Sequence, residues 1–163
     1  MAAQSIETAK STQPQPFYVN VRVKLSALWT ALLLIFAFLD IFSIYRPDFR
    51  AELAAGEVGG FAIGEPFLLA IAMYVVIPSL MVVGALVLRP SVNRIVNVVL
   101  AVVYALTIVV GTIGEWTYYV VGSAVEVALL AAIVHQAWTW PRLISAGADI
   151  SREEPTGRLA PAR

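Results

Sequence analysis

The sequence predicts an all-α integral membrane protein, a four-helix bundle whose antiparallel helices run up-down-up-down. Of its 163 residues, 60% are hydrophobic and only 13% are charged, about half the charged share of a typical soluble domain. The apolar residues gather into four runs, each close to the ~20 residues that a helix needs to cross ~30 Å of hydrocarbon. These runs are continuously apolar and lack the period-two alternation of a membrane barrel strand, which favours helices.

The four runs place a membrane domain at residues 25–141, with spans at about 25–45, 66–88, 92–113 and 117–140. The first run is too long, and starts too late, for a cleavable signal peptide. An outer loop at 46–65 contains several glycines that allow tight turns after a short amphipathic piece around 47–55. The other two connections are short, so spans two and three are expected to pack together, as are spans three and four.

Both ends of the chain are polar, and basic residues predict which side of the membrane they occupy. Residues 1–24 are expected to form a polar cytoplasmic tail and residues 142–163 a disordered cytoplasmic tail. Only Arg46 and Arg50 fall on the opposite side of the spans. The excess of basic residues beside the termini predicts a plasma (inner) membrane protein with both termini cytoplasmic; these residues are Lys10, Arg22, Lys24, Arg89, Arg94, Arg142, Arg152, Arg158 and Arg163.

Composition argues against several classes of function. The formal net charge is zero, so no basic surplus indicates nucleic acid as a partner, and the lipid bilayer is the expected environment. The absence of cysteine excludes disulfides, thiolate metal sites and thiol catalysis. The single histidine, His135, has no companion at helical spacing that would complete a metal site, so we expect neither metal nor cofactor.

Two carboxylates inside the apolar runs carry the functional hypothesis. Glu126 falls near the middle of the fourth span and Asp40 about two turns from the outer end of the first. Because a charge in hydrocarbon is costly, both should face the bundle interior. Helical spacing aligns Tyr119 with Glu126 and Trp29 with Asp40, while Tyr104 lies on the polar face of the third span. These five residues form a predicted polar seam, the candidate ligand- or proton-binding site.

Four further residues are expected to have structural polar roles. Pro78 cannot donate a backbone hydrogen bond to the Tyr74 carbonyl, which is thereby freed at nearly the depth of Glu126. A protonated Glu126 is therefore predicted to donate to that carbonyl. Asn97 belongs to a polar stripe of the third span, and His135 is expected to lie at the membrane interface or to bond to Asn97.

Polar residues near the span ends are interpreted more simply. Asn93 also belongs to the third-span stripe, and together with Arg94 it is expected to start that helix in contact with lipid headgroups. Glu65 and Glu115 are expected to be solvated loop charges near the mouth of the seam.

Several separated motifs resemble those of one family. They are LSALW at Leu25–Trp29, Asp40, AGEVGG at Ala55–Gly60, Pro78–Met81, NRIVN at Asn93–Asn97, and YY followed by Glu-Val and AWTWP in the fourth span. Over residues 25–141 the chain resembles an uncharacterised bacterial family of small four-span integral membrane proteins, a domain of unknown function. The resemblance implies the four-span architecture and a bacterial inner membrane, and it carries no activity or catalytic residue.

Three classes of function remain open, of which the sequence favours the first. In the first, the acidic seam binds or conducts a small solute, cation or proton, with a homo-oligomer completing the pathway. In the second, the chain is a non-catalytic membrane subunit or assembly protein whose buried carboxylates join helices, and a partner subunit is required. In the third, Glu126 or Asp40 is the general acid or base of a lipid-modifying enzyme. Because no nucleophile, triad or metal motif accompanies them, we expect no catalytic residue and no enzyme.

Overall fold

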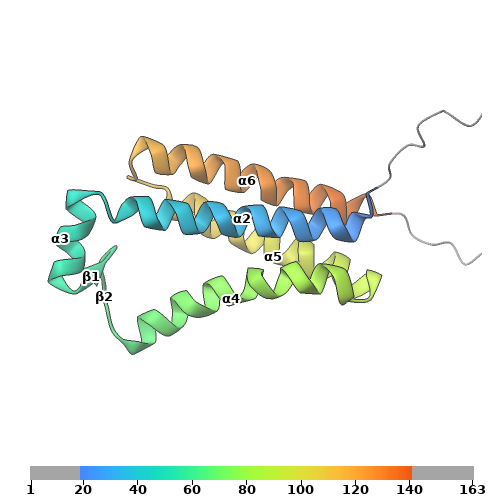
Figure 1. Cartoon of the computed structure of the whole chain (residues 1–163), viewed down its shortest axis with the longest axis horizontal. Coiled ribbons are helices and arrows are strands. Elements are labelled where there is room, and N and C mark those ends of the chain that lie inside the picture. Colours follow the sequence, from blue (N-terminus) through green and yellow to red (C-terminus); the bar gives the residue numbers. More distant parts are fainter. Residues whose placement is uncertain (1–18, 141–163) are drawn as a thin grey trace, which may run out of the picture.

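The structure, a computed structural model, describes residues 19–140, which fold into five helices and one short β-hairpin (Figure 1). Four of the helices are long and apolar enough to cross a membrane, so the predicted all-α architecture with four helices of membrane-spanning length is confirmed. Their ends lie within four residues of the predicted span ends. Residues 1–18 of the tail predicted at 1–24, and the whole tail predicted at 142–163, lie outside the described residues, with Lys10, Arg142, Arg152, Arg158 and Arg163. The first helix begins at Val21, so the last residues of the predicted first tail are helical. The elements are α2 (Val21–Ser43), α3 (Pro47–Ala55), β1 (Glu57–Val58), β2 (Phe61–Ala62), α4 (Glu65–Val87), α5 (Pro90–Gly111) and α6 (Thr117–Trp138).

Local sequence explains where the helices start and stop. Asn20 caps α2 by accepting a hydrogen bond from the backbone N–H of Arg22 (3.0 Å). Proline occupies the first turn of α3, α4 and α5, where its missing N–H costs nothing. Helix α3 ends at Gly56, whose φ of 77° is a left-handed conformation suited to glycine.

The four long helices form an open arc in the order α4, α2, α6, α5. Helix α2 packs along both α4 and α6, and α5 packs along α6. Few residues of α4, in contrast, lie close to residues of α5. The expected packing of spans three and four is therefore confirmed. Spans two and three, also expected to pack together, touch through a few side-chain contacts and do not pack along their whole length. Figure 1 shows α4 diverging from α2 toward the end that carries α3 and the strands. We call this the hairpin end, and the end that carries the start of α2 and the end of α6 the terminal end.

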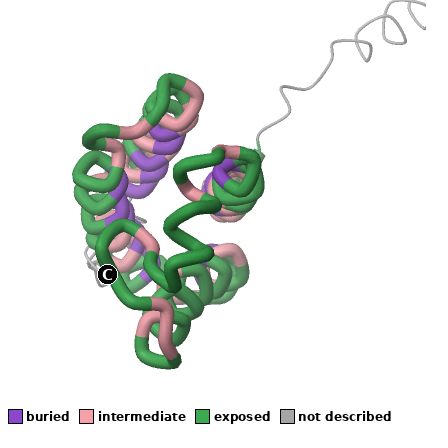
Figure 2. Tube along the Cα trace, turned by 90° about the vertical axis from the view of Figure 1, so that its left-hand side faces the viewer, coloured by how far each residue is buried: buried purple, intermediate pink, exposed green. Residues whose placement is uncertain are grey.

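The packed core fills the terminal half of the arc and thins toward the hairpin end. Figure 2, a view onto the hairpin end, shows buried residues along the inward faces of the long helices and an exposed α3 and β-hairpin. Helix α4 has no buried residue before Pro78, and from its hairpin half only the half-buried Tyr74 packs against the core. The core residues are Leu25, Trp29, Leu32, Met81, Ala85, Ala101, Tyr104, Ile108, Leu130 and Ile133.

The β-hairpin is an element that the sequence analysis missed. Strands β1 and β2 pair antiparallel around a two-residue turn, Gly59 and Gly60, whose φ angles of 55° and 81° fit a type I′ turn. The Gly-Gly pair between two short runs was the available signal. Glu52 of α3 accepts a hydrogen bond from the backbone N–H of Gly59 (3.0 Å), which ties the turn to the helix.

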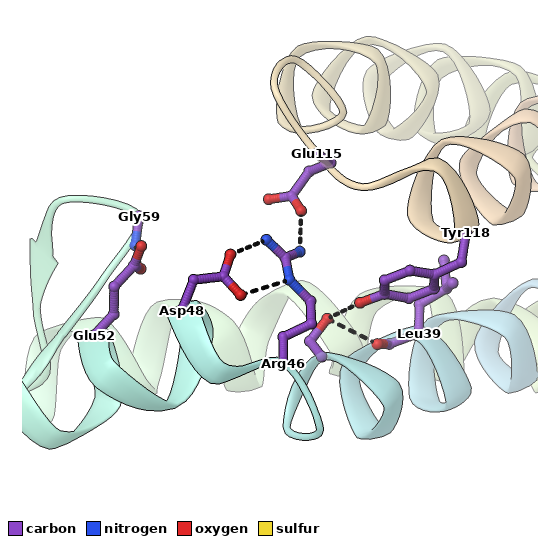
Figure 3. Close-up of polar contacts among 8 residues, drawn as sticks. Leu39, Arg46, Asp48, Glu52, Gly59, Glu115 and Tyr118 are labelled. Atoms are coloured by element: carbon purple, nitrogen blue, oxygen red, sulfur yellow. Dashed lines mark hydrogen bonds and ion pairs between the residues drawn. The ribbon is translucent and has the colours of Figure 1, made fainter.

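Arg46 fastens the hairpin end of the molecule (Figure 3). Its guanidinium bonds the carboxylates of Asp48 and Glu115 and lies 4.9 Å from the centre of the Trp116 ring. Glu115 is therefore paired and does not have the solvated role expected for it, whereas Glu65 is exposed. The hydrogen bond from Arg46 holds the pKa of the Asp48 carboxyl below its ordinary value. The start of α3 is thus joined to the connection between α5 and α6.

A second link at the same end joins α2 to α6. The hydroxyl groups of Ser43 and Tyr118 are 3.0 Å apart, and the Ser43 hydroxyl donates to the Leu39 carbonyl. Tyr118 must therefore donate to Ser43, since a serine hydroxyl has one proton. Deeper in the same interface, a Cβ at Gly122 would lie 2.6 Å from a Leu39 methyl carbon, so glycine is what allows α2 and α6 to approach.

Candidate functional site

A buried hydrogen-bond network in the terminal half accounts for three of the polar residues. Trp29 donates through Nε1 to Asn97 (2.7 Å), Asn97 donates to the Asn93 carbonyl (2.8 Å), and Asn93 donates to the Ala85 carbonyl (2.7 Å). Ala85 lies in the last turn of α4, where carbonyls have no intrahelical partner, so Asn93 also caps that helix. The network joins α2, α5 and α4 and satisfies the side chains that it uses.

This network changes the roles expected from sequence. Asn93 is fully buried, so its predicted contact with lipid headgroups is wrong; Arg94 instead lies over the Trp138 ring (4.9 Å). Asn97 bonds to Trp29 and not to His135, which is exposed. The exposed position agrees with the interfacial alternative for His135.

Proline in α4 creates a second polar contact near the middle of the bundle. Because Pro78 lacks an N–H, the carbonyl of Tyr74 is free, and the hydroxyl of Tyr104 donates to it (2.6 Å). The freed carbonyl was predicted correctly. The prediction that Glu126 donates to this carbonyl is wrong, because Tyr104 is the donor.

The neighbouring hydroxyl groups of Tyr74, Tyr104 and Thr107 donate their protons to one another or to the backbone. The Thr107 hydroxyl donates to the Tyr104 carbonyl (2.9 Å) and lies 2.9 Å from the Tyr74 hydroxyl. Since Thr107 has no second proton, Tyr74 donates to Thr107. Tyr74 and Tyr104 therefore each use their proton within the protein, and both phenolic oxygens keep acceptor capacity.

Inside the arc, next to these hydroxyl groups, lies a cavity of about 220 Å³. All four long helices contribute to its wall, and it sits in the hairpin half, where the core is thin. Its size exceeds the ~150 Å³ of a cavity that admits benzene. The lining residues are Phe36, Leu39, Asp40, Ile71, Tyr74, Val75, Thr107, Ile108, Gly111, Tyr119 and Glu126.

Glu126 is the innermost charged group of the cavity wall. Its residue is 2% exposed, and its Oε1 atom is buried without a hydrogen-bond partner among residues 19–140. It lies nine residues into α6 from Thr117, about 14 Å along the helix axis. A buried carboxyl oxygen without a partner costs about 1–3 kcal/mol. The fold therefore maintains an unsatisfied acceptor at the wall of a cavity.

The other polar groups of the cavity add to its acceptor character. Asp40 borders the cavity from α2, and Tyr119 borders it from the first turn of α6. No lining residue is basic. Within residues 19–140, no group of three His, Cys, Asp or Glu side chains lies close enough to hold a metal ion. The chemistry that the cavity presents is that of two carboxyl groups and aromatic rings, which attract a cation or a hydrogen-bond donor.

The structure brings together part of the predicted seam. Glu126, Asp40 and Tyr119 share the cavity, and Tyr74, expected to be structural, joins them. Tyr104 and Trp29 lie behind this wall, packed edge to face with their ring centres 6.2 Å apart. Thr107 was missed in the sequence analysis, although its position three residues after Tyr104 is typical of a threonine that bonds back to its own helix.

Comparison with known proteins gives one match. Residues 17–146 match the model of a Family of unknown function (DUF6326). The chain belongs to the DUF6326 family. This match covers all four membrane helices, the buried network and the cavity, so the DUF6326 domain coincides with the bundle. No curated protein matches the chain, and no solved structure matches it.

Proposed function

We propose that this DUF6326 protein binds a small cationic solute in the acidic cavity of its membrane bundle. The observation that carries the proposal is Glu126, which lines the cavity and has a buried Oε1 atom without a hydrogen-bond partner among the described residues. A carboxyl group retained only to join helices would be bonded to a neighbouring helix, as Asn97 is. A cation placed between Glu126 and Asp40 supplies the opposite charge that the cavity wall lacks.

We further propose that the bundle lies in the plasma membrane with its hairpin end outside. Among the described residues, the terminal end carries basic side chains and no acidic one, namely Arg22, Lys24, Arg89 and Arg94. The hairpin end carries mainly acidic side chains, namely Asp48, Glu52, Glu57, Glu65 and Glu115 beside Arg46 and Arg50. This distribution supports cytoplasmic termini by the positive-inside rule, and it places an acidic surface outside the cavity, where cations gather.

Calorimetric titration of the purified protein in lipid nanodiscs tests the binding proposal. We expect saturable binding of tetramethylammonium and no binding of its uncharged analogue tert-butanol. Glu126→Gln should weaken binding of the cation at least about tenfold, because it removes one of the two attracting charges and a contact between unit charges at ~4 Å amounts to ~4 kcal/mol at an effective dielectric constant of about 20. Glu57→Gln removes an exposed carboxylate outside the cavity and should leave the affinity unchanged.

Two results would contradict the proposal. One is the absence of saturable binding of tetramethylammonium to the folded wild-type protein. The other is an equal affinity in Glu126→Gln and wild type. If Glu126→Gln also lowers thermal stability, the carboxyl joins helices, and the chain is better explained as a subunit or assembly protein.

A further inference from the structure

The cavity is open on the side between α4 and α5. These two helices are the ends of the arc, and few residues of one lie close to residues of the other. Of the cavity residues that they contribute, Ile71, Val75, Thr107 and Gly111 are exposed, whereas Tyr74 is half-buried and Ile108 is buried. Helix α4 has no buried residue before Pro78. The hydrogen bond between Tyr74 and Thr107 bridges the two helices at one level, and the gap continues on its hairpin side, beside Ile71 and Gly111. In a bilayer, such an opening faces lipid acyl chains and not water.

The polarity of the cavity changes from its inner wall to this opening. Glu126 lies on α6, across the arc from the gap, and Asp40 lies on α2. At the gap itself the wall is mainly aliphatic, with Ile71 and Val75, and Gly111 leaves open space, since a Cβ there would meet no atom within 4 Å. A ligand that fits this gradient has a cationic head and an apolar chain.

We propose that the solute is a single-chain amphipathic amine taken from the bilayer, with its head in the acidic cavity and its chain leaving between α4 and α5 into the lipid. This inference rests on the proposed function and specifies the ligand class. We call the gap lined by Ile71, Val75, Thr107 and Gly111 the lateral opening. Because the chain stays among lipid tails when the head binds, chain length is not limited by the volume of the cavity.

A displacement series tests the lateral opening. Labelled tetramethylammonium is bound to the protein in nanodiscs and displaced by alkyltrimethylammonium probes from butyl to octyl, so that only occupation of the cavity is counted. The aqueous probe concentration that displaces half of the label should fall about fourfold for each added methylene, because the probe concentrates in the bilayer from which it binds. A cavity that opens only to water should instead reject the longer chains.

Two variants fill the opening and one provides a control. Gly111→Trp, from α5, and Ile71→Trp, from α4, should each abolish the gain in affinity from butyl to octyl. Val110→Trp places the same bulk on the neighbouring residue of α5, which is 67% exposed and outside the cavity wall, and should retain that gain. Helix content and thermal stability of all three are measured first, and the two opening variants back each other if one fails to fold.

The outcomes separate this inference from the proposed function. If labelled tetramethylammonium does not bind to wild type, the proposed function fails. If it binds, but longer chains displace it no better or Gly111→Trp and Ile71→Trp keep the full chain-length gain, the lateral opening is wrong and the cation site stands. Loss of the gain in the two opening variants, with Val110→Trp unchanged, supports the lateral opening.

Discussion

Two buried polar residues in opposite halves of the bundle differ in their hydrogen bonding, and the difference distinguishes a structural role from a functional one. Asn97 accepts from Trp29 and donates to Asn93, so its side chain is satisfied and joins helices. Glu126 is just as inaccessible, yet its Oε1 has no partner among the described residues. Natural proteins keep such a destabilising group mainly where function requires it.

The contrast predicts opposite effects of the same replacement. Glu126→Leu should raise the free energy of unfolding by about 1–3 kcal/mol, because it removes an unpaired buried acceptor and keeps a similar volume. Asn97→Leu should lower it by a similar amount, because it leaves the Trp29 donor unpaired. Thermal unfolding of both variants in one lipid environment at neutral pH gives the comparison. A loss of stability in Glu126→Leu equal to that in Asn97→Leu would contradict the interpretation of Glu126 as a ligand-binding group.

Among the elements, α4 is the helix that shapes the site. Its terminal half is anchored by Pro78, Met81 and Ala85, and the side chain of Arg22 donates to the Leu86 carbonyl in its last turn (2.6 Å). Its hairpin half diverges and leaves the arc open. The change occurs around Pro78, where the missing backbone hydrogen bond frees the Tyr74 carbonyl for Tyr104. The tyrosine contact therefore compensates for the proline.

This compensation predicts a dependence between two positions on different helices. Tyr104→Phe should lower the free energy of unfolding by about 1–3 kcal/mol in the wild-type background, since the Tyr74 carbonyl is left without a donor. In a Pro78→Ala background the same change should cost much less, because an amide hydrogen at position 78 can reach that carbonyl. A double-mutant cycle on unfolding measures the difference. Equal costs in the two backgrounds would show that Tyr104 stabilises the fold in some other way.

On the scale of the whole molecule, the two ends of the bundle differ in charge and in construction. The terminal end is basic and tightly packed, with Arg22 and Arg94 lying over the rings of Trp140 and Trp138. The hairpin end is acidic, held by Arg46, and sits above the thinnest part of the core. This asymmetry supports the proposed orientation, in which the acidic end faces the outer solution.

Membrane orientation is directly measurable, because the sequence contains no cysteine. Glu57→Cys, on β1 at the hairpin end, should react with a membrane-impermeant maleimide in intact cells. Ser91→Cys, at the start of α5 at the terminal end, should react only after the cells are permeabilised. The reverse pattern would invert the proposed orientation and place the acidic end in the cytoplasm.

The sequence by itself determined the four membrane helices, their approximate ends, and the turning of Glu126, Asn97 and Tyr104 toward the interior. These are local properties: apolar length sets a span, proline and glycine mark its ends, and helical spacing assigns a residue to a face. Only the tertiary structure decided that α4 diverges from its neighbours at the hairpin end. It also decided that Tyr104 and not Glu126 donates to the Tyr74 carbonyl, and that Trp29 donates to Asn97. Helical spacing gives the direction in which a side chain points around the axis of its own helix. The identity of its partner depends on the rotation and separation of neighbouring helices, which packing of the whole bundle sets.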